Sequence, residues 1–384
     1  MVNSGTAMNL SEAQDDAPIP LVLFVALPAN LGGSNRSLLT LITALRPSMR
    51  CVLAAPAHGS FRALTSQSNL FDQHIALPHG SKWRRLRAAL LLARWALAHR
   101  AELTAIHAQA LTGLNVAALA AFITRVPVVV RVSDPIGSRW GRFLGPILRR
   151  LLPKLRVVPV SEAAALVAVD NGICGLEDCR VVPNPIDPAL VVAAKKLVAS
   201  SSLRVGYLGG LSRRKGFDLL PDMVNALLDV RVTWVLFLNR RGDPAIDQAL
   251  QEIERHSSDV VEIRKRVKDV RTAYAACDVI FVPSRAESFC RVAAEAMMNR
   301  LPVVASDIPA LRALLGDGEA GLLFPPEDTT SAAGAIRRLV LDPELRQSLG
   351  AVGLLRAERF EPRAIASEML PLYGISRSSG PTCQ

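Results

Sequence analysis

Two carboxylates with a fixed spacing are the residues of this chain best suited to chemistry. Glu287 and Glu295 stand eight positions apart, between apolar strand-like segments at residues 279–282 and 302–305. The pattern predicts strand, loop, helix and strand, with Glu287 in the loop and Glu295 on the helix. A helix that begins near Phe289 would aim its free N–H groups at the loop, where a phosphate could bind. Glu295 would lie about two turns along, where a ribose could offer it two hydroxyls.

The surroundings of Glu295 favour a buried binding role over a solvated one. Two acids at this spacing can simply share a wet helix face. Glu295, however, lies within the small apolar stretch of residues 293–297. An ionised carboxylate in such a setting needs a partner.

A cluster of cations is the second candidate site. Arg213, Arg214 and Lys215 stand between Gly209 and Gly216, at an expected strand-to-helix turn. Three cations beside glycines suit a diphosphate, although a solvated basic loop has the same composition. No Asp-x-Asp pair, the usual place for a divalent ion on a diphosphate, is present. We therefore expect neither a metal nor a bound cofactor.

The stretch from Glu287 to Glu295 resembles the E-x7-E signature of the retaining group 1 (family 4-like) glycosyltransferases. The similarity continues through residues 182–187, 207–216, 302–307 and 321–328, and covers most of residues 20–375. The resemblance implies an α/β protein with two Rossmann-like, doubly wound parallel-sheet domains facing a cleft, the GT-B fold. It also implies sugar transfer from a nucleotide-diphosphate sugar with retention at the anomeric carbon.

The resemblance also implies residue roles. Glu287 would hold the sugar ring, Lys215 would stabilise the leaving diphosphate and Asp134 would orient a hydroxyl as the third catalytic residue. The expected donor-binding residues are Glu295, Arg213, Arg214, Gly209, Ser288, Phe289, Cys290, Arg291, Gly32 and Gly33. Arg36 is a further candidate beside the two N-terminal glycines.

Three positions depart from the family pattern. Gly210 stands where an Arg is common, Cys290 where a Gly is frequent, and Ser133 where a His often follows a strand. These departures keep two alternatives open. One is a catalytically silent GT-B subunit that binds nucleotide or a partner enzyme. The other is a sugar-nucleotide epimerase on the same fold.

The length and the strand pattern predict the domain organisation. A chain of 384 residues is too long for one ordinary core. We expect a disordered tail at 1–19, an acceptor-side domain at 20–199, a linker at 200–202 and a nucleotide-sugar domain at 203–360. A C-terminal helix and tail at 361–384 follow, and the helix is expected to cross back to the first domain. Strands alternate with helices, which is typical of parallel sheets covered on both faces. The expected strands are residues 21–27, 51–56, 103–107, 126–132, 203–208, 233–238, 260–263 and 279–282. Ser34 is expected to cap a helix that runs to about residue 45.

The net charge of +11 is concentrated in two stretches. Residues 73–101 and 135–161 hold six Lys or Arg each and no acid. The pattern of charged and apolar residues within them predicts basic amphipathic helices at 81–100 and 139–156. In the first, Trp83, Leu86, Leu90, Ala93 and Leu97 would share one face. These segments are either ordinary surface helices or helices that bind an anionic membrane. The binding free energy of such a helix gains about 1 kcal/mol for each basic residue near the membrane surface. No aromatic stacking motif accompanies the charges, so nucleic acid is not expected.

The remaining composition bears on location. The six cysteines lack metal-ligand spacing, the first 20 residues lack a signal-peptide pattern, and no apolar run reaches membrane-spanning length. We expect a cytoplasmic bacterial enzyme, peripheral at the inner face of the cell membrane. Together with the resemblance, this predicts transfer from a UDP- or GDP-sugar to a glycan or lipid-linked acceptor in surface polysaccharide or glycolipid synthesis.

Overall fold

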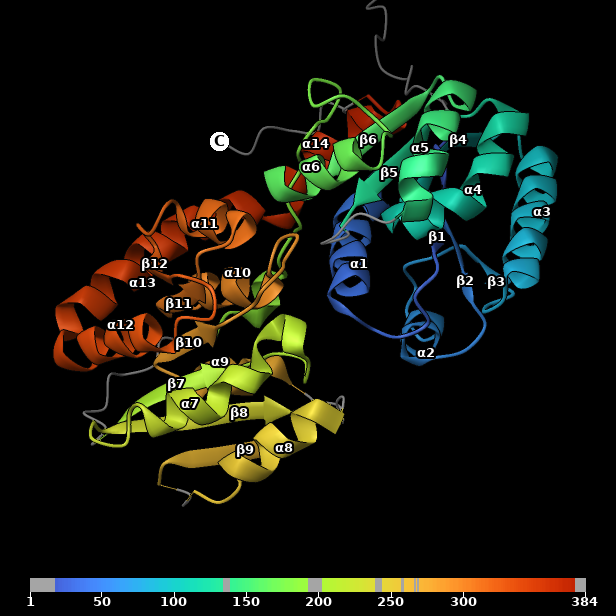
Figure 1. The fold of residues 1–384 in the computed structure, drawn as a ribbon. Helices are drawn as coiled ribbons and strands as arrows, with labels where there is room; N and C mark the ends of the chain where they lie inside the picture. The colour runs from blue at the N-terminus through green and yellow to red at the C-terminus, as the bar shows by residue number, and fades with distance from the viewer. Residues whose placement is uncertain are drawn as a thin grey trace, which may run out of the picture.

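The computed structural model describes residues 18–133, 139–192, 202–238, 244–256, 259–265, 267 and 269–376. Asp134, most of the expected N-terminal tail and most of the expected linker lie outside these ranges. The described residues build two six-stranded sheets flanked by helices (Figure 1). We call the part around the first sheet the N-terminal domain and the part around the second the C-terminal domain.

All strands of the first sheet run parallel, in the order β3-β2-β1-β4-β5-β6. They are β1 Leu21–Ala26, β2 Arg50–Pro56, β3 Gln73–Leu77, β4 Leu103–Gln109, β5 Val128–Val132 and β6 Leu155–Pro159. The central strands are near-continuous apolar runs because helices cover both faces of a parallel sheet. Every residue of β1 is buried.

The second sheet repeats this order as β9-β8-β7-β10-β11-β12. Its strands are β7 Leu203–Tyr207, β8 Val232–Leu238, β9 Val261–Lys265, β10 Val279–Val282, β11 Val303–Ser306 and β12 Gly321–Phe324. In both sheets the strand order reverses beside the first strand, between β1 and β4 and between β7 and β10. Open α/β sheets bind ligands at the carboxyl ends of strands at such a point. The predicted pair of doubly wound parallel sheets is thereby confirmed.

Within the described ranges, fourteen α-helices accompany the two sheets, and the last three follow the final strand β12. Those of the N-terminal domain are α1 Gly33–Leu45, α2 Ser60–Ser66, α3 Lys82–Ala98, α4 Ala110–Thr124, α5 Arg139–Leu151 and α6 Glu162–Asp170. Those after β7 are α7 Leu220–Asn225, α8 Pro244–Ile253, α9 Val270–Ala275, α10 Arg291–Met298, α11 Pro309–Leu315, α12 Thr329–Leu341, α13 Pro343–Ala357 and α14 Pro362–Met369.

Two predicted helix starts were wrong. The N-cap of α1 is Gly32 and not Ser34, because the Ser34 hydroxyl contacts side chains of other elements. Helix α10 begins at Arg291 rather than near Phe289. Cys290 stands at its N-cap with a φ of 66°, a left-handed conformation that cannot continue a helix. Glu295 is therefore only about one turn into α10.

The last helix, α14, packs on the N-terminal domain, beside α1 (Figure 1). The following 3-10 turn, residues 370–373, buries Tyr373 in the same core as β1. Arg131 on β5, itself buried, donates to the carbonyl of Val182 at 3.1 Å. These contacts fix the segment 182–187 and the C-terminal turn behind the first sheet.

The buried face of α3 differs from the apolar face predicted for residues 81–100. Ala93 is buried, whereas Trp83 is 77% exposed and Leu86, Leu90 and Leu97 are also exposed. The buried side of the helix consists of Ala88, Ala89, Leu92, Ala93 and Ala96. In the described part of the chain, no helix combines the length and the apolar character that a membrane crossing requires.

Candidate active site

An ion pair between two loops of the C-terminal domain forms the centre of the site. Lys215 follows β7, and Glu287 lies in the loop after the neighbouring strand β10. The Lys215 Nζ donates to Glu287 Oε1, which also accepts from the Ser284 hydroxyl at 2.9 Å. The Glu287 side chain is only 7% exposed. A carboxylate this buried keeps its charge at tolerable cost only when it is paired, as it is here.

A small pocket opens beside this pair. Its walls are Tyr207, Leu208, Gly209, Lys215, Phe281, Val282, Pro283, Ser284, Glu287, Cys290 and Val292. The turn after Lys215 requires glycine: Gly216 has a φ of 70°, and a Cβ there would lie 1.9 Å from the Pro283 carbonyl oxygen. This close approach brings the β7 and β10 loops together and places Lys215 against Glu287.

Cys290 forms one wall of the pocket at the start of α10. Burial raises the pKa of its thiol to about 12. The thiol therefore remains protonated and acts as a small neutral wall rather than as a nucleophile.

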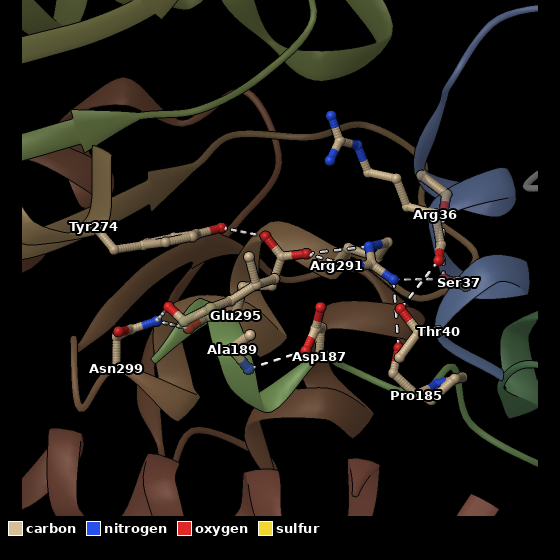
Figure 2. Close-up of polar contacts among 12 residues, drawn as sticks. Arg36, Ser37, Thr40, Pro185, Asp187, Ala189, Tyr274, Arg291, Glu295 and Asn299 are labelled. Atoms are coloured by element: carbon tan, nitrogen blue, oxygen red, sulfur yellow. Dashed lines mark hydrogen bonds and ion pairs between the residues drawn. The ribbon is translucent and has the colours of Figure 1, made fainter. Parts of the chain in front are cut away.

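Both oxygens of Glu295 already have partners (Figure 2). Arg291 donates to Oε1 through Nη2 at 2.7 Å and Nε at 3.1 Å, and the Tyr274 hydroxyl donates to Oε2 at 2.7 Å. Burial and the nearby Glu295 charge hold the pKa of Tyr274 well above its ordinary value, so it stays a donor. The buried Glu295 carboxylate is thus paired with Arg291, a cation one turn earlier on the same helix.

Arg291 also links the two domains. Its Nη1 donates to the Ser37 hydroxyl on α1 at 2.7 Å and to the Pro185 carbonyl at 3.3 Å (Figure 2). A Cβ on Gly33 would lie 3.4 Å from the Arg291 Cδ, so the start of α1 lies directly beside this side chain. Arg36, one turn along, is exposed.

Three serines make a second contact between the domains. The Ser288 hydroxyl donates to the Ser133 carbonyl at 2.9 Å, and the Ser161 hydroxyl donates to the Ser288 carbonyl. The loops after β5 and β6 therefore touch the loop after β10. Ser133 therefore contacts Ser288, the residue directly after Glu287.

The structure brings some of the predicted site residues together and separates others. Gly209, Lys215, Glu287 and Cys290 share the pocket. Arg214 lies 4.0 Å from Glu287, whereas the Arg213 side chain is 79% exposed and lies 4.0 Å from Asp218. The other predicted positions are Ser288 at the domain contact, Phe289 buried against Phe360, and Gly32 facing open space.

Several residues around the site have no signal in the sequence. Tyr274 comes from α9, and Ser37 from the N-terminal domain. Arg285 fixes the loop before Glu287 by donating twice to Asp218, at 2.8 and 2.9 Å. Among the residues that the structure describes, no group of three or more His, Cys, Asp or Glu side chains is placed to hold a metal ion.

Family models match both halves of the chain. Residues 31–190 match the Glycosyltransferase Family 4 model, and residues 202–342 match the Glycosyl transferases group 1 model. Together these regions cover more than three quarters of the chain; the first contains every strand of the N-terminal sheet except β1, and the second contains the whole C-terminal sheet. The chain therefore belongs to the group 1, family 4-like glycosyltransferases with the GT-B fold, as its E-x7-E segment predicted.

Curated relatives are similar over part of their length. A D-inositol 3-phosphate glycosyltransferase from Stackebrandtia nassauensis is 30% identical over 57% of this chain and 53% of its own. A phosphatidyl-myo-inositol mannosyltransferase from Mycobacterium leprae is 30% identical over 54% and 56%. The chain thus spans about half the length of the relatives it matches. Among solved structures, HepE from Anabaena, in complex with UDP and glucose, superposes with a TM-score of 0.77 over 92% of this chain and 99% of its own, at 22% identity.

Proposed function

We propose that this protein is a retaining glycosyltransferase that moves a sugar from a UDP- or GDP-sugar to a glycan or lipid-linked acceptor. The Lys215–Glu287 pair carries the proposal. It places a cation and an acid in one pocket, at the point where the second sheet reverses its strand order. The structural neighbour HepE binds UDP and glucose, which supports a nucleotide-sugar donor.

In the proposed reaction, Lys215 stabilises the departing diphosphate. Negative charge grows on the leaving phosphate as the sugar becomes oxocarbenium-like, so a fixed cation there acts more on the transition state than on the ground state. Arg214 adds a second cation near the same carboxylate. The first N–H groups of α10, beside Cys290, supply further donors. Glu287 accepts hydrogen bonds from the hydroxyls of the sugar ring.

Glu295 is proposed to hold the ribose, and this role requires Arg291 to move. Both oxygens of the carboxylate are occupied, so ribose hydroxyls can bind only by displacing a present donor. Tyr274 is buried, whereas Arg291 lies at the domain contact and has the longer, more adaptable side chain. Release of Arg291 would also free its guanidinium for the diphosphate, a group that arginine binds well.

The charge neutralisation by Lys215, Arg214 and Arg291 supports turnover without a divalent ion. Sugar transfer that survives EDTA and gains nothing from added Mg²⁺ or Mn²⁺ is the expected result. Loss of activity in EDTA with recovery on Mn²⁺ would contradict this part of the proposal.

We further propose that α3 holds the enzyme at the inner face of the cell membrane. The helix exposes five cations, Lys82, Arg84, Arg85, Arg87 and Arg94. It also exposes the large apolar residues Trp83, Leu86, Leu90 and Leu97. Large apolar groups beside unburied cations suit an anionic lipid surface. On α5 the case is weaker, because Arg142 and Arg149 form ion pairs with Asp170 and Asp178. Replacing Trp83 and Leu90 by Ser should release the protein from vesicles containing phosphatidylglycerol in a sedimentation assay, whereas Leu341→Ser, on the exposed end of α12, should not.

A nucleotide-sugar panel with stereochemical analysis tests the central proposal. The protein is incubated with UDP-glucose, UDP-galactose, UDP-N-acetylglucosamine and GDP-mannose, with and without a lipid extract as acceptor. Nucleotide release that depends on the acceptor, and a product with the anomeric configuration of the donor, are expected. Binding without turnover of any donor would favour a silent subunit, whereas interconversion of free nucleotide sugars would favour an epimerase.

A further inference from the structure

Two cysteine thiols are in contact in the loop between α6 and the segment 182–187. The Sγ atoms of Cys174 and Cys179 lie 2.9 Å apart. A small movement of either side chain would bring them to the bonding distance of a disulfide, about 2.05 Å. The turn between them is closed by the Cys179 N–H, which donates to the Leu176 carbonyl at 3.2 Å. The two side chains therefore already face each other as thiols.

The loop that carries the pair is attached to two neighbouring elements. Cys179 forms a single parallel bridge with Val157 on β6, and the Arg180 N–H donates to the Val157 carbonyl at 3.2 Å. Asp178 accepts from Arg149 of α5 at 2.8 Å. The backbone beside Cys179 is thus held in place, so the two thiols can join without a change in the fold around them.

The surroundings of the pair favour redox chemistry over a metal site. A structural zinc ion takes four ligands, and among the residues that the structure describes no cluster of three or more His, Cys, Asp or Glu is placed to hold a metal. Cys51, Cys277 and Cys290 are buried, whereas Cys179 is half-buried and accessible to a small solute. Cys179 is therefore the thiol that a reagent in solution meets first.

The hydrogen bonds give the two thiols different roles. Cys179 Sγ lies 3.5 Å from the Gly175 carbonyl oxygen, which can only accept, so the Cys179 S–H donates there. The Cys174 S–H then donates to the Cys179 sulfur. This donation stabilises a Cys179 thiolate, the form that attacks a disulfide. Burial still raises the pKa of both thiols, so we expect the reaction to take minutes to hours at neutral pH.

We propose that Cys174 and Cys179 are a site of reversible oxidation by low-molecular-weight disulfides. The Cys179 thiolate attacks the small disulfide, forms a mixed disulfide with one half and releases the other half as a thiol. Cys174 then loses its proton to solvent, attacks the Cys179 sulfur and releases the second half. The pair gives up two electrons and two protons in total, and the small disulfide takes them up as two thiols.

The new bond would stiffen the chain next to the contact between the domains. Residues 182–187 follow the pair and include the Pro185 carbonyl, which accepts from Arg291. A cytosol keeps such thiols reduced, so the pair stays a dithiol until the pool of small thiols becomes oxidised. Closing the loop 174–179 should raise the midpoint of thermal unfolding by a few degrees. This chemistry needs no sugar substrate and can be tested independently of the proposed function.

Mass spectrometry of trapped thiols tests the site. All proteins carry Cys383→Ser, which removes the cysteine outside the described residues. The reduced protein is incubated with oxidised glutathione, then denatured in N-ethylmaleimide and digested with trypsin. The peptide of residues 157–180 contains both cysteines. We expect it to carry no N-ethylmaleimide and to be two hydrogens lighter than its reduced form. Dithiothreitol should restore both N-ethylmaleimide adducts.

Single variants test the two roles. Cys174→Ser should stop at the mixed disulfide and keep one glutathione on Cys179. Cys179→Ser should gain no glutathione, because Cys174 is only 5% exposed. Cys51→Ala is the matched control, since it removes a buried cysteine of β2 and should leave the oxidation of the pair unchanged.

The wild type alone decides the central point, whether or not a variant folds. Thermal unfolding of the oxidised protein should show a higher midpoint than that of the reduced protein, and Cys174→Ser should show no such rise. A peptide 157–180 that remains doubly alkylated after a day in oxidised glutathione would overturn the inference, as would a glutathione adduct that never converts to the internal bond. Glutathione on Cys174 rather than on Cys179 would overturn the assigned roles.

Discussion

The two sides of the domain interface use different chemistry. On the C-terminal side, the groups are charged and paired: Lys215 with Glu287 and Arg291 with Glu295. On the N-terminal side, they are neutral, and an imidazole, an amide and hydroxyls run from His107 to Ser133. Charges act strongly on phosphates but cost desolvation, whereas neutral donors select hydroxyls by geometry at little electrostatic cost. The difference fits a donor whose diphosphate lies against the charged side.

The largest expected effect comes from removing the cation of the charged side. Lys215→Met should lower kcat by about 100-fold or more, since loss of one electrostatic donor to a transition state costs about 2.7–4 kcal/mol. Steady-state transfer from the preferred nucleotide sugar measures it. Lys265→Met is the control, because Lys265 lies at the end of the edge strand β9 and forms an exposed ion pair with Glu254. If both variants turn over equally, the charged side is not where the diphosphate departs.

Arg291 joins the two sides, and its removal should cost stability. Arg291→Met leaves Glu295 buried with Tyr274 as its remaining side-chain donor, and breaking a buried ion pair from one side costs about 3 kcal/mol. Thermal unfolding should show a clearly lower midpoint. Adding Glu295→Gln to this variant should recover part of the loss, because the unpaired charge is gone. A double variant less stable than Arg291→Met would mean that charge pairing does not explain the contact.

The neutral side predicts a pH dependence of stability. The pKa of His107 is about 3 in the folded protein and about 6.5 when unfolded, so between these values the unfolded chain binds a proton that the folded one excludes. Stability from this group is complete above pH 6.5 and is lost as the pH falls, by about 2 kcal/mol at pH 5. Urea unfolding at pH 7 and pH 5 should therefore show a smaller acid loss for His107→Gln than for the wild type. Equal losses would show that His107 does not oppose protonation in the fold.

The charged side could be predicted from the sequence because each of its two parts is a short local pattern. The E-x7-E segment and the Gly209–Gly216 turn follow two strands that lie side by side, so these patterns pointed to Glu287, Glu295 and Lys215. Helix α10 still begins later than predicted, because Cys290 takes a left-handed conformation that could not be predicted from a cysteine. The partners Tyr274 and Ser284 were missed, since neither residue type nor spacing marks them.

The neutral side could not be predicted from the sequence. His107 meets Tyr373 across 266 positions, and nothing in either segment indicates the other. Ser34 was interpreted as a helix cap because serine favours that place, but its hydroxyl is used by Gln109. On α3, the four large residues of the predicted apolar face are exposed but Ala93 is buried, so the prediction that all five share one face was wrong. Asp134 lies outside the described residues and its role stays a prediction.

The smallest expected effect distinguishes the three neighbouring cations of the charged side. The sequence treats Arg213, Arg214 and Lys215 alike, whereas only Lys215 lines the pocket and Arg213 is largely in solvent, at 4.0 Å from Asp218. A surface pair at that distance contributes about 0–1 kcal/mol, so Arg213→Ala should change kcat/KM by less than about threefold. The kcat/KM of Arg214→Ala should lie between the values for the Arg213 and Lys215 variants, because Arg214 donates to the Ala286 carbonyl beside Glu287. Initial-rate assays of Lys215→Met, Arg214→Ala and Arg213→Ala at one donor concentration below KM give the order directly. An Arg213 variant as impaired as the Lys215 variant would mean that the loop rearranges on donor binding and brings Arg213 to the phosphates.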